Sequence, residues 1–182
     1  LDAAHLDALR TWCRDTGVRL VADEIYHGIT FEAPAPTAAA DPDVMVVGSF
    51  SKYFSMTGWR LGWMLVPPDL AVAVDRLAQN LFLCPPALAQ HAAIAALDPD
   101  AEAELDGHVD RYRTNRDLVL ATLADLGITT VAPADGAFYV YAEVGPWHDD
   151  SVELCRDWLQ DHRVAATPGV DFSTMLGIIR GG

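Results

Sequence analysis

Three short apolar runs constrain the fold of this chain more than any other feature of its sequence. Each run has the length of a buried strand; the first is followed by an aspartate, the second by a glycine and the third by a pair of prolines. The three runs are residues 18–22, 44–47 and 61–66. Helical periodicity precedes the first run over residues 2–16, and proline pairs open further helices over about 69–80 and 86–97. This alternation of apolar strands and helices predicts an α/β fold.

The pattern changes in the second half of the chain. A long helix is predicted over residues 100–125 and is followed by short strands and one more helix. The predicted strands are residues 128–131, 137–144 and 164–167, and the predicted helix is 151–162. We therefore expect residues 1–110 to be the C-terminal portion of a large α/β domain, and residues 111–182 to be a small, truncated α+β C-terminal domain.

Composition excludes several classes of function. The net charge of −14 opposes binding to nucleic acid or to an anionic membrane through bulk electrostatics. No apolar run approaches the roughly 18 residues that a membrane span needs. The three cysteines are odd in number and far apart, and the six histidines show no metal-ligand spacing. We expect a cytoplasmic protein with reduced thiols and no metal site.

Lys52 is the only lysine among twelve basic side chains, and it lies just after the apolar run 44–47. Arginine cannot replace lysine as a nucleophile, because guanidinium stays protonated whereas a desolvated amine can lose its proton. A single amine at the end of a buried strand therefore indicates imine chemistry, with a carbonyl substrate or with pyridoxal phosphate. The alternative from position alone is an exposed lysine left by an arginine-rich composition.

The neighbours of Lys52 favour the cofactor. Asp23 ends one predicted strand and Lys52 follows the next, so parallel strands would place both side chains at the same edge of the sheet. A carboxylate there can keep the cofactor's ring nitrogen protonated, and the Tyr26 phenol can hydrogen-bond its ring oxygen. Hydroxyls and a guanidinium for its phosphate are supplied by Ser49, Ser51 and Arg60. Taken singly, these residues are equally typical of a helix cap, of turns and of a surface ion pair.

Three motifs carry a resemblance to a known family. They are Val21-Ala22-Asp23-Glu24-Ile25-Tyr26, Ser49-Phe50-Ser51-Lys52 and Gly58-Trp59-Arg60-Leu61-Gly62. In order and spacing they resemble the class I/II aminotransferases, the aspartate aminotransferase-like enzymes of fold type I. Gly136-Ala137-Phe138-Tyr139 and Pro168-Gly169 resemble later segments of the same family. The resemblance implies a pyridoxal phosphate-dependent enzyme that moves an amino group between an amino acid and a 2-oxo acid.

The resemblance also implies a role for each site residue. Lys52 would form the internal aldimine with the cofactor and then move a proton to and from the substrate α-carbon. Asp23 would pair with the pyridinium nitrogen, and Tyr26 would bind the cofactor oxygen. The phosphate would be held by Ser49, Ser51 and Arg60.

Arg180 is the candidate for binding the substrate carboxylate, because family members use an arginine near the C-terminus. The family's upstream phosphate loop and stacking aromatic residue are not found in the sequence, so we expect a fragment, roughly the second half, of a homodimeric enzyme. Two alternatives stay open: a β-elimination lyase using the same cofactor apparatus, and a non-catalytic, aminotransferase-like sensor domain of a regulator.

Overall fold

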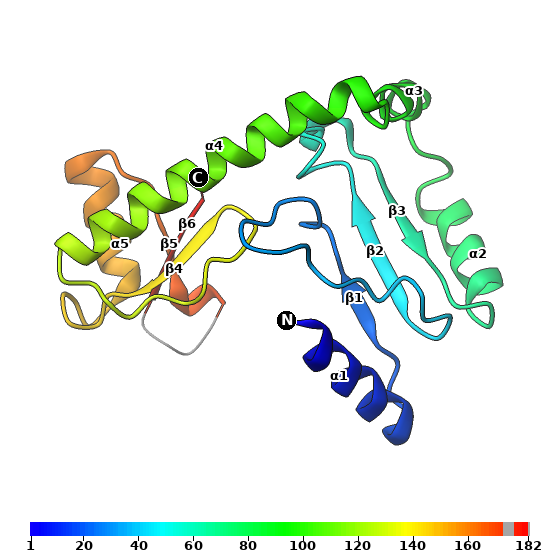
Figure 1. Ribbon diagram of the computed structural model, residues 1–182, viewed down its shortest axis with the longest axis horizontal. Coiled ribbons are helices and arrows are strands. Elements are labelled where there is room, and N and C mark those ends of the chain that lie inside the picture. The colour runs from blue at the N-terminus through cyan, green and yellow to red at the C-terminus, as the bar shows by residue number, and fades with distance from the viewer. Residues whose placement is uncertain (173–176, 182) are drawn as a thin grey trace. The chain divides into compact units, whose positions relative to one another are not determined.

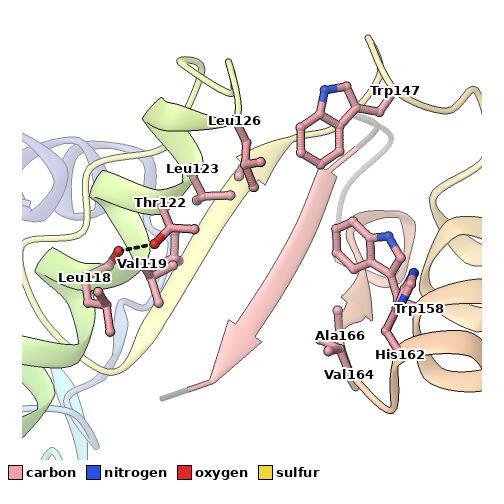
Figure 2. Close-up of a pocket in the computed structure, with 12 residues that line it drawn as sticks. Leu118, Val119, Thr122, Leu123, Leu126, Trp147, Trp158, His162, Val164 and Ala166 are labelled. Carbon is pink, nitrogen blue, oxygen red and sulfur yellow. Dashed lines mark hydrogen bonds between the residues drawn. The ribbon is translucent and has the colours of Figure 1, made fainter.

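The computed structural model describes residues 1–172 and the backbone of residues 177–181. The chain is α/β and divides into two compact units, Leu1–Gly107 (unit 1) and His108–Gly182 (unit 2). The division falls within the long helix α4, Pro99–Asp125. Figure 1 labels the elements in chain order. No helix in the described part of the chain has the length and apolar character needed to cross a bilayer.

Unit 1 is built around a three-stranded sheet with the order β1-β2-β3. The strands are β1 (Val21–Asp23), β2 (Met45–Ser49) and β3 (Gly62–Leu65). β1 and β2 run parallel, whereas β3 is antiparallel to β2. The short 3-10 helix η1, Thr57–Trp59, lies between β2 and β3 in the chain. The parallel pair brings the carboxyl ends of β1 and β2 to one edge of the sheet.

The first helix, α1 (Ala3–Thr16), packs on this sheet through Leu6, which is buried together with Ala38, Val44 and Val46. The side chain of Asp2 caps its start by accepting from the His5 N–H at 2.9 Å. Gly17, with φ 70°, ends it in the left-handed conformation that glycine adopts at little cost.

A partly buried ion pair fixes α1 to the loop before β2. Asp41 is 5% exposed and accepts from Nε and Nη2 of Arg10 at 2.9 and 2.7 Å. Its other oxygen accepts from the Asp43 N–H at 3.0 Å. The backbone hydrogen bond from Asp43 and the Arg10 guanidinium together hold the pKa of Asp41 below its usual value.

Two further helices of unit 1 are α2 (Ala71–Leu81) and α3 (Ala87–Ala96). α3 buries Ala93 against Phe50 and Met56, which follow β2. α2 buries none of its residues. Large apolar side chains are exposed on and after it: Val72, Leu77, Leu81, Phe82 and Leu83.

Unit 2 contains an antiparallel sheet with the order β4-β6-β5, formed by β4 (Tyr139–Glu143), β5 (Thr167–Pro168) and β6 (Gly177–Gly181). Helix α5, Ser151–His162, begins where Asp150 accepts from the N–H groups of Val152 and Glu153. The short helix η2, Gly169–Asp171, follows β5. The core of this unit is formed by Ile128, Ala142, Val144, Leu154 and Cys155.

Two strand predictions for unit 2 are wrong in extent. Residues 128–131 form no strand; Val131 alone makes an isolated bridge to Ala142. The run follows Gly127, which has φ 81°, and buries Ile128 in the core instead of pairing it along a ladder. The predicted strand 164–167 begins only at Thr167. An apolar residue just after a turn can thus be buried without belonging to a strand.

Candidate active site

The carboxyl edge of the β1–β2 pair carries the first two candidate residues. Asp23 is the last residue of β1 and lies opposite Val47 in the parallel register, while Ser49 ends β2. The condition set by the sequence analysis, parallel pairing of these two strands, is therefore met. The Asp23 side chain is exposed, and its Oδ1 accepts from the Ile25 N–H at 3.2 Å. This bond fixes the carboxylate where the chain leaves the strand.

Lys52 and Tyr26 meet beyond this edge. The Lys52 Nζ atom lies 5.3 Å from the centre of the Tyr26 ring, and both residues are half-buried. At this distance the ring face attracts a protonated amine. The backbone turns tightly after Lys52, because the Ser55 N–H donates to the Lys52 carbonyl at 3.0 Å and Ser55 has φ 55°. The backbone of Lys52, and with it the base of the side chain that bears the amine, is therefore held in a hydrogen-bonded turn.

The candidate phosphate-binding residues share one hydrogen-bonded loop. The Ser49 Oγ accepts from the Ser51 N–H at 3.0 Å, and the Thr57 hydroxyl donates to the Ser51 carbonyl at 2.5 Å. Arg60 Nη1 donates to the Thr57 carbonyl at 3.0 Å, and Arg60 itself has φ 55°. The loop thus joins Ser49, Ser51 and the exposed Arg60 through Thr57. Two hydroxyls and one guanidinium are a suitable set for an anion.

Arg180 belongs to β6, where its backbone lies opposite Val140. Its side chain lies outside the part of the chain that the structure describes. Its assignment to the substrate carboxylate is therefore still a prediction. Among the residues described, no cluster of His, Cys, Asp and Glu is arranged to hold a metal ion.

Sequence reasoning missed Glu24, which braces the strand end that carries Asp23. Its carboxylate accepts from the Ala38 N–H and from the Thr37 hydroxyl, each at 2.7 Å. Its Oε2 also lies 3.2 Å from His27 Nδ1, and its side chain is only 12% exposed. Spacing along the chain could not identify this role, because the two residues that bond to Glu24 lie 13 and 14 positions away in the sequence.

Sequence reasoning also missed Tyr53, the residue after Lys52. Its hydroxyl donates to Asp106 Oδ1 on α4 at 2.8 Å. Burial raises the pKa of Tyr53 to about 12, and the Asp106 carboxylate adds to the effect. Its ring also makes an edge contact with Phe54, with 5.1 Å between the ring centres.

Comparison with known proteins agrees with these motifs. The profile of the family described as "Aminotransferase class I and II" matches residues 1–180. The chain belongs to this family. The valine–pyruvate aminotransferase of Mycobacterium tuberculosis is 48% identical over 176 residues, which are 95% of this chain and 45% of that protein. The aspartate aminotransferase of Sulfolobus acidocaldarius is 30% identical, over 97% of this chain and 46% of its own length.

Solved structures show the same likeness. A crystal structure of an aminotransferase from Mycobacterium tuberculosis superposes with a TM-score of 0.94 at 44% identity, covering 100% of this chain and 48% of that one. A double mutant of Thermus thermophilus aspartate aminotransferase gives 0.89 at 29% identity, over 97% of this chain and 47% of its own. These neighbours are fold-type I aminotransferases. The chain spans about half the length of the relatives that it matches.

Proposed function

We propose that this chain is the lysine-bearing half of a pyridoxal phosphate-dependent aminotransferase, the parent enzyme, which moves an amino group between an amino acid and a 2-oxo acid. One observation carries the proposal. The only lysine of a chain in this family lies with its Nζ atom 5.3 Å from the Tyr26 ring centre, at the sheet edge where Asp23 ends β1. Amine, phenol and carboxylate therefore share one edge of the sheet.

The donor set fits the cofactor. Pyridoxal phosphate needs an amine for its aldehyde carbon, an acid for its ring nitrogen, a donor for its ring oxygen and an anion site for its phosphate. Lys52 and Tyr26 meet each other, and Asp23 lies at the end of the strand paired with β2. The loop that contains Ser49, Ser51 and Arg60 supplies the hydroxyls and the guanidinium. When bound, the cofactor supplies an electron sink for negative charge at the substrate α-carbon.

Each side chain then has a defined task. The Lys52 Nζ atom joins the protein to the cofactor and, once released, takes up and returns the proton of the substrate α-carbon. The Asp23 carboxylate favours a positively charged partner by direct electrostatic attraction. The Tyr26 hydroxyl donates to an anionic ring oxygen. Arg180 is proposed to hold the substrate carboxylate through a bidentate contact.

The proposal extends to the location and assembly of the parent enzyme. We propose a cytoplasmic enzyme, because Cys13, Cys84 and Cys155 are all free in the structure. We also propose a homodimer, in keeping with the family resemblance. The apolar side chains exposed on α2 form a surface of unit 1 that the rest of the parent enzyme or a second subunit can bury.

A half-reaction tests the proposed function. The parent enzyme loaded with pyridoxal phosphate is mixed with a single amino acid, and the 2-oxo acid, the aminated cofactor and free ammonia are measured. We expect stoichiometric 2-oxo acid and aminated cofactor without ammonia. Valine is the first amino acid to try, because a relative named valine–pyruvate aminotransferase is 48% identical to this chain. Ammonia and pyruvate from a β-substituted amino acid would instead establish the lyase.

A further inference from the structure

Tyr53 is held on two sides by residues from distant parts of unit 1. On one side is Gly28, in the segment that follows Tyr26. A Cβ atom built on Gly28 would lie 2.7 Å from Cδ2 of the Tyr53 ring, so only a glycine permits this approach. The φ of Gly28 is also positive, at 92°. The Tyr26 segment therefore packs its backbone directly against the residue that follows Lys52.

On the other side, the Tyr53 hydroxyl donates to Asp106 at 2.8 Å. A hydrogen bond to a carboxylate is shorter and stronger than one between neutral groups. This hydrogen bond connects the turn after β2 to α4, two elements that are far apart in the sequence. Ring and hydroxyl thus fix Tyr53 by independent contacts.

We propose that Tyr53 is a positioning residue for Lys52. It aligns the turn that carries the amine with the Tyr26 segment through Gly28, and anchors that turn to α4 through Asp106. Lysine has a flexible four-carbon stem, so the location of its Nζ atom depends on how firmly its backbone is held. A misplacement of about 1 Å at a reacting group can cost on the order of 100-fold in rate. The inference rests on the proposed function of Lys52.

The test begins with the reactivity of the amine in the parent enzyme without cofactor. An N-hydroxysuccinimide ester acylates exposed amines, and trypsin then releases residues 20–60 as one peptide whenever Lys52 is acylated, because Lys52 is the only internal cleavage site. Tyr53→Phe removes the hydroxyl and keeps the ring, and Asp106→Ala removes the carboxylate that accepts the hydrogen bond. We expect either variant to acylate Lys52 about fivefold faster, as loss of one hydrogen bond allows.

The double variant Tyr53→Phe/Asp106→Ala should react no faster than either single variant, because the two changes break the same contact. Tyr112→Phe is the matched control. It removes a tyrosine hydroxyl from α4, where the Tyr112 ring packs on Phe138 in unit 2, and the Lys52 acylation rate should not change. With cofactor and substrates, the two single variants should lower kcat about fivefold with a smaller change in KM.

The outcomes separate the two claims. If wild-type enzyme transaminates but both single variants keep the wild-type acylation rate and kcat, Tyr53 does not position Lys52 and the proposed function stands. If the acylation effects of the two single variants multiply in the double variant, Tyr53 and Asp106 do not act through one contact, and the proposal is also overturned. If the wild-type enzyme does not transaminate, the proposed function fails, and the positioning role fails with it whatever the acylation rates.

Discussion

The Lys52 Nζ atom lies 5.3 Å from the centre of the Tyr26 ring, although the two residues follow different strands of the unit 1 sheet. The parallel pairing of β1 with β2 brings the two segments to the same edge. The contact therefore depends on long-range sheet pairing, which brings together segments that are distant in the sequence. It unites the proposed nucleophile with the phenol proposed to bind the cofactor oxygen.

The substitution Tyr26→Phe tests the contribution of the Tyr26 hydroxyl separately from that of the ring. We expect the variant to fold normally and to keep the half-buried setting of Lys52, because the ring face is retained. Loss of the hydroxyl donor should lower the affinity of the parent enzyme for pyridoxal phosphate by about tenfold, since the cofactor oxygen loses one hydrogen bond. Equilibrium titration of the cofactor absorbance measures this affinity. An unchanged Kd would show that the Tyr26 hydroxyl does not bind the cofactor.

Glu24→Ala tests the brace at the end of β1. The substitution leaves the Ala38 N–H and the Thr37 hydroxyl without their acceptor, and it removes the carboxylate beside His27. We expect a loss of about 2 kcal/mol in the free energy of unfolding, measured by urea denaturation. Glu104→Ala is the control, because Glu104 is exposed on α4 and its removal should change stability by less than about 0.5 kcal/mol. Equal effects from both substitutions would rule out the brace.

Gly48→Ala tests the packing of β2 on β3. A Cβ atom at Gly48 would lie 2.2 Å from Cε2 of the Trp63 indole, so the ring would have to move. We expect a destabilisation of about 1–3 kcal/mol from overpacking, measured by thermal unfolding. Gly107→Ala is the matched control: its Cβ meets nothing within 4 Å, and alanine in the interior of α4 should stabilise the chain by about 1 kcal/mol. A neutral Gly48→Ala would show that Trp63 does not pack as described.

Asp41→Asn tests the ion pair between α1 and the loop before β2. The folded-state pKa of Asp41 is lowered, so the ionised group contributes stability above its ordinary pKa of 3.8, and this contribution is lost as the pH falls through the folded-state value. We therefore expect the wild type to exceed Asp41→Asn in stability by about 2 kcal/mol at pH 7, with the difference shrinking below about pH 4. Urea denaturation at pH 7 and pH 3 measures both. A difference that does not depend on pH would contradict the assignment to charge.

Sequence patterns predicted the elements of unit 1 because its strands and helices have strong local signals. The apolar run 44–47 became β2, and the run 61–66 became β3, although only as Gly62–Leu65. The run 18–22 was wrong in extent, because the strand there covers only Val21–Asp23. The motif spacing also identified the residues that gather at the carboxyl edge of β1 and β2, since parallel pairing follows from fold-level rules. Their chemical roles are still predictions.

Contacts between distant segments could not be predicted in the same way. The bonds of Glu24 to Thr37 and Ala38, and of Tyr53 to Asp106, join segments whose separation in sequence carries no pattern. For the segment 128–131 the sequence instead predicted a strand that the structure does not contain. Its apolar residues are typical of a strand, yet Ile128 is buried directly after a turn and only Val131 pairs. Burial alone therefore does not distinguish a strand from a packed loop.

The most direct test of the proposed site is to locate the cofactor's covalent attachment. The parent enzyme is loaded with pyridoxal phosphate, reduced with borohydride and digested, and the pyridoxyl group is located by mass spectrometry. We predict the label on Lys52 alone, its absence in Lys52→Ala, and its absence in Lys52→Arg, which keeps the charge but cannot join to the aldehyde carbon. A pyridoxyl label on another residue of the wild type, or one retained by Lys52→Ala, would contradict the central claim.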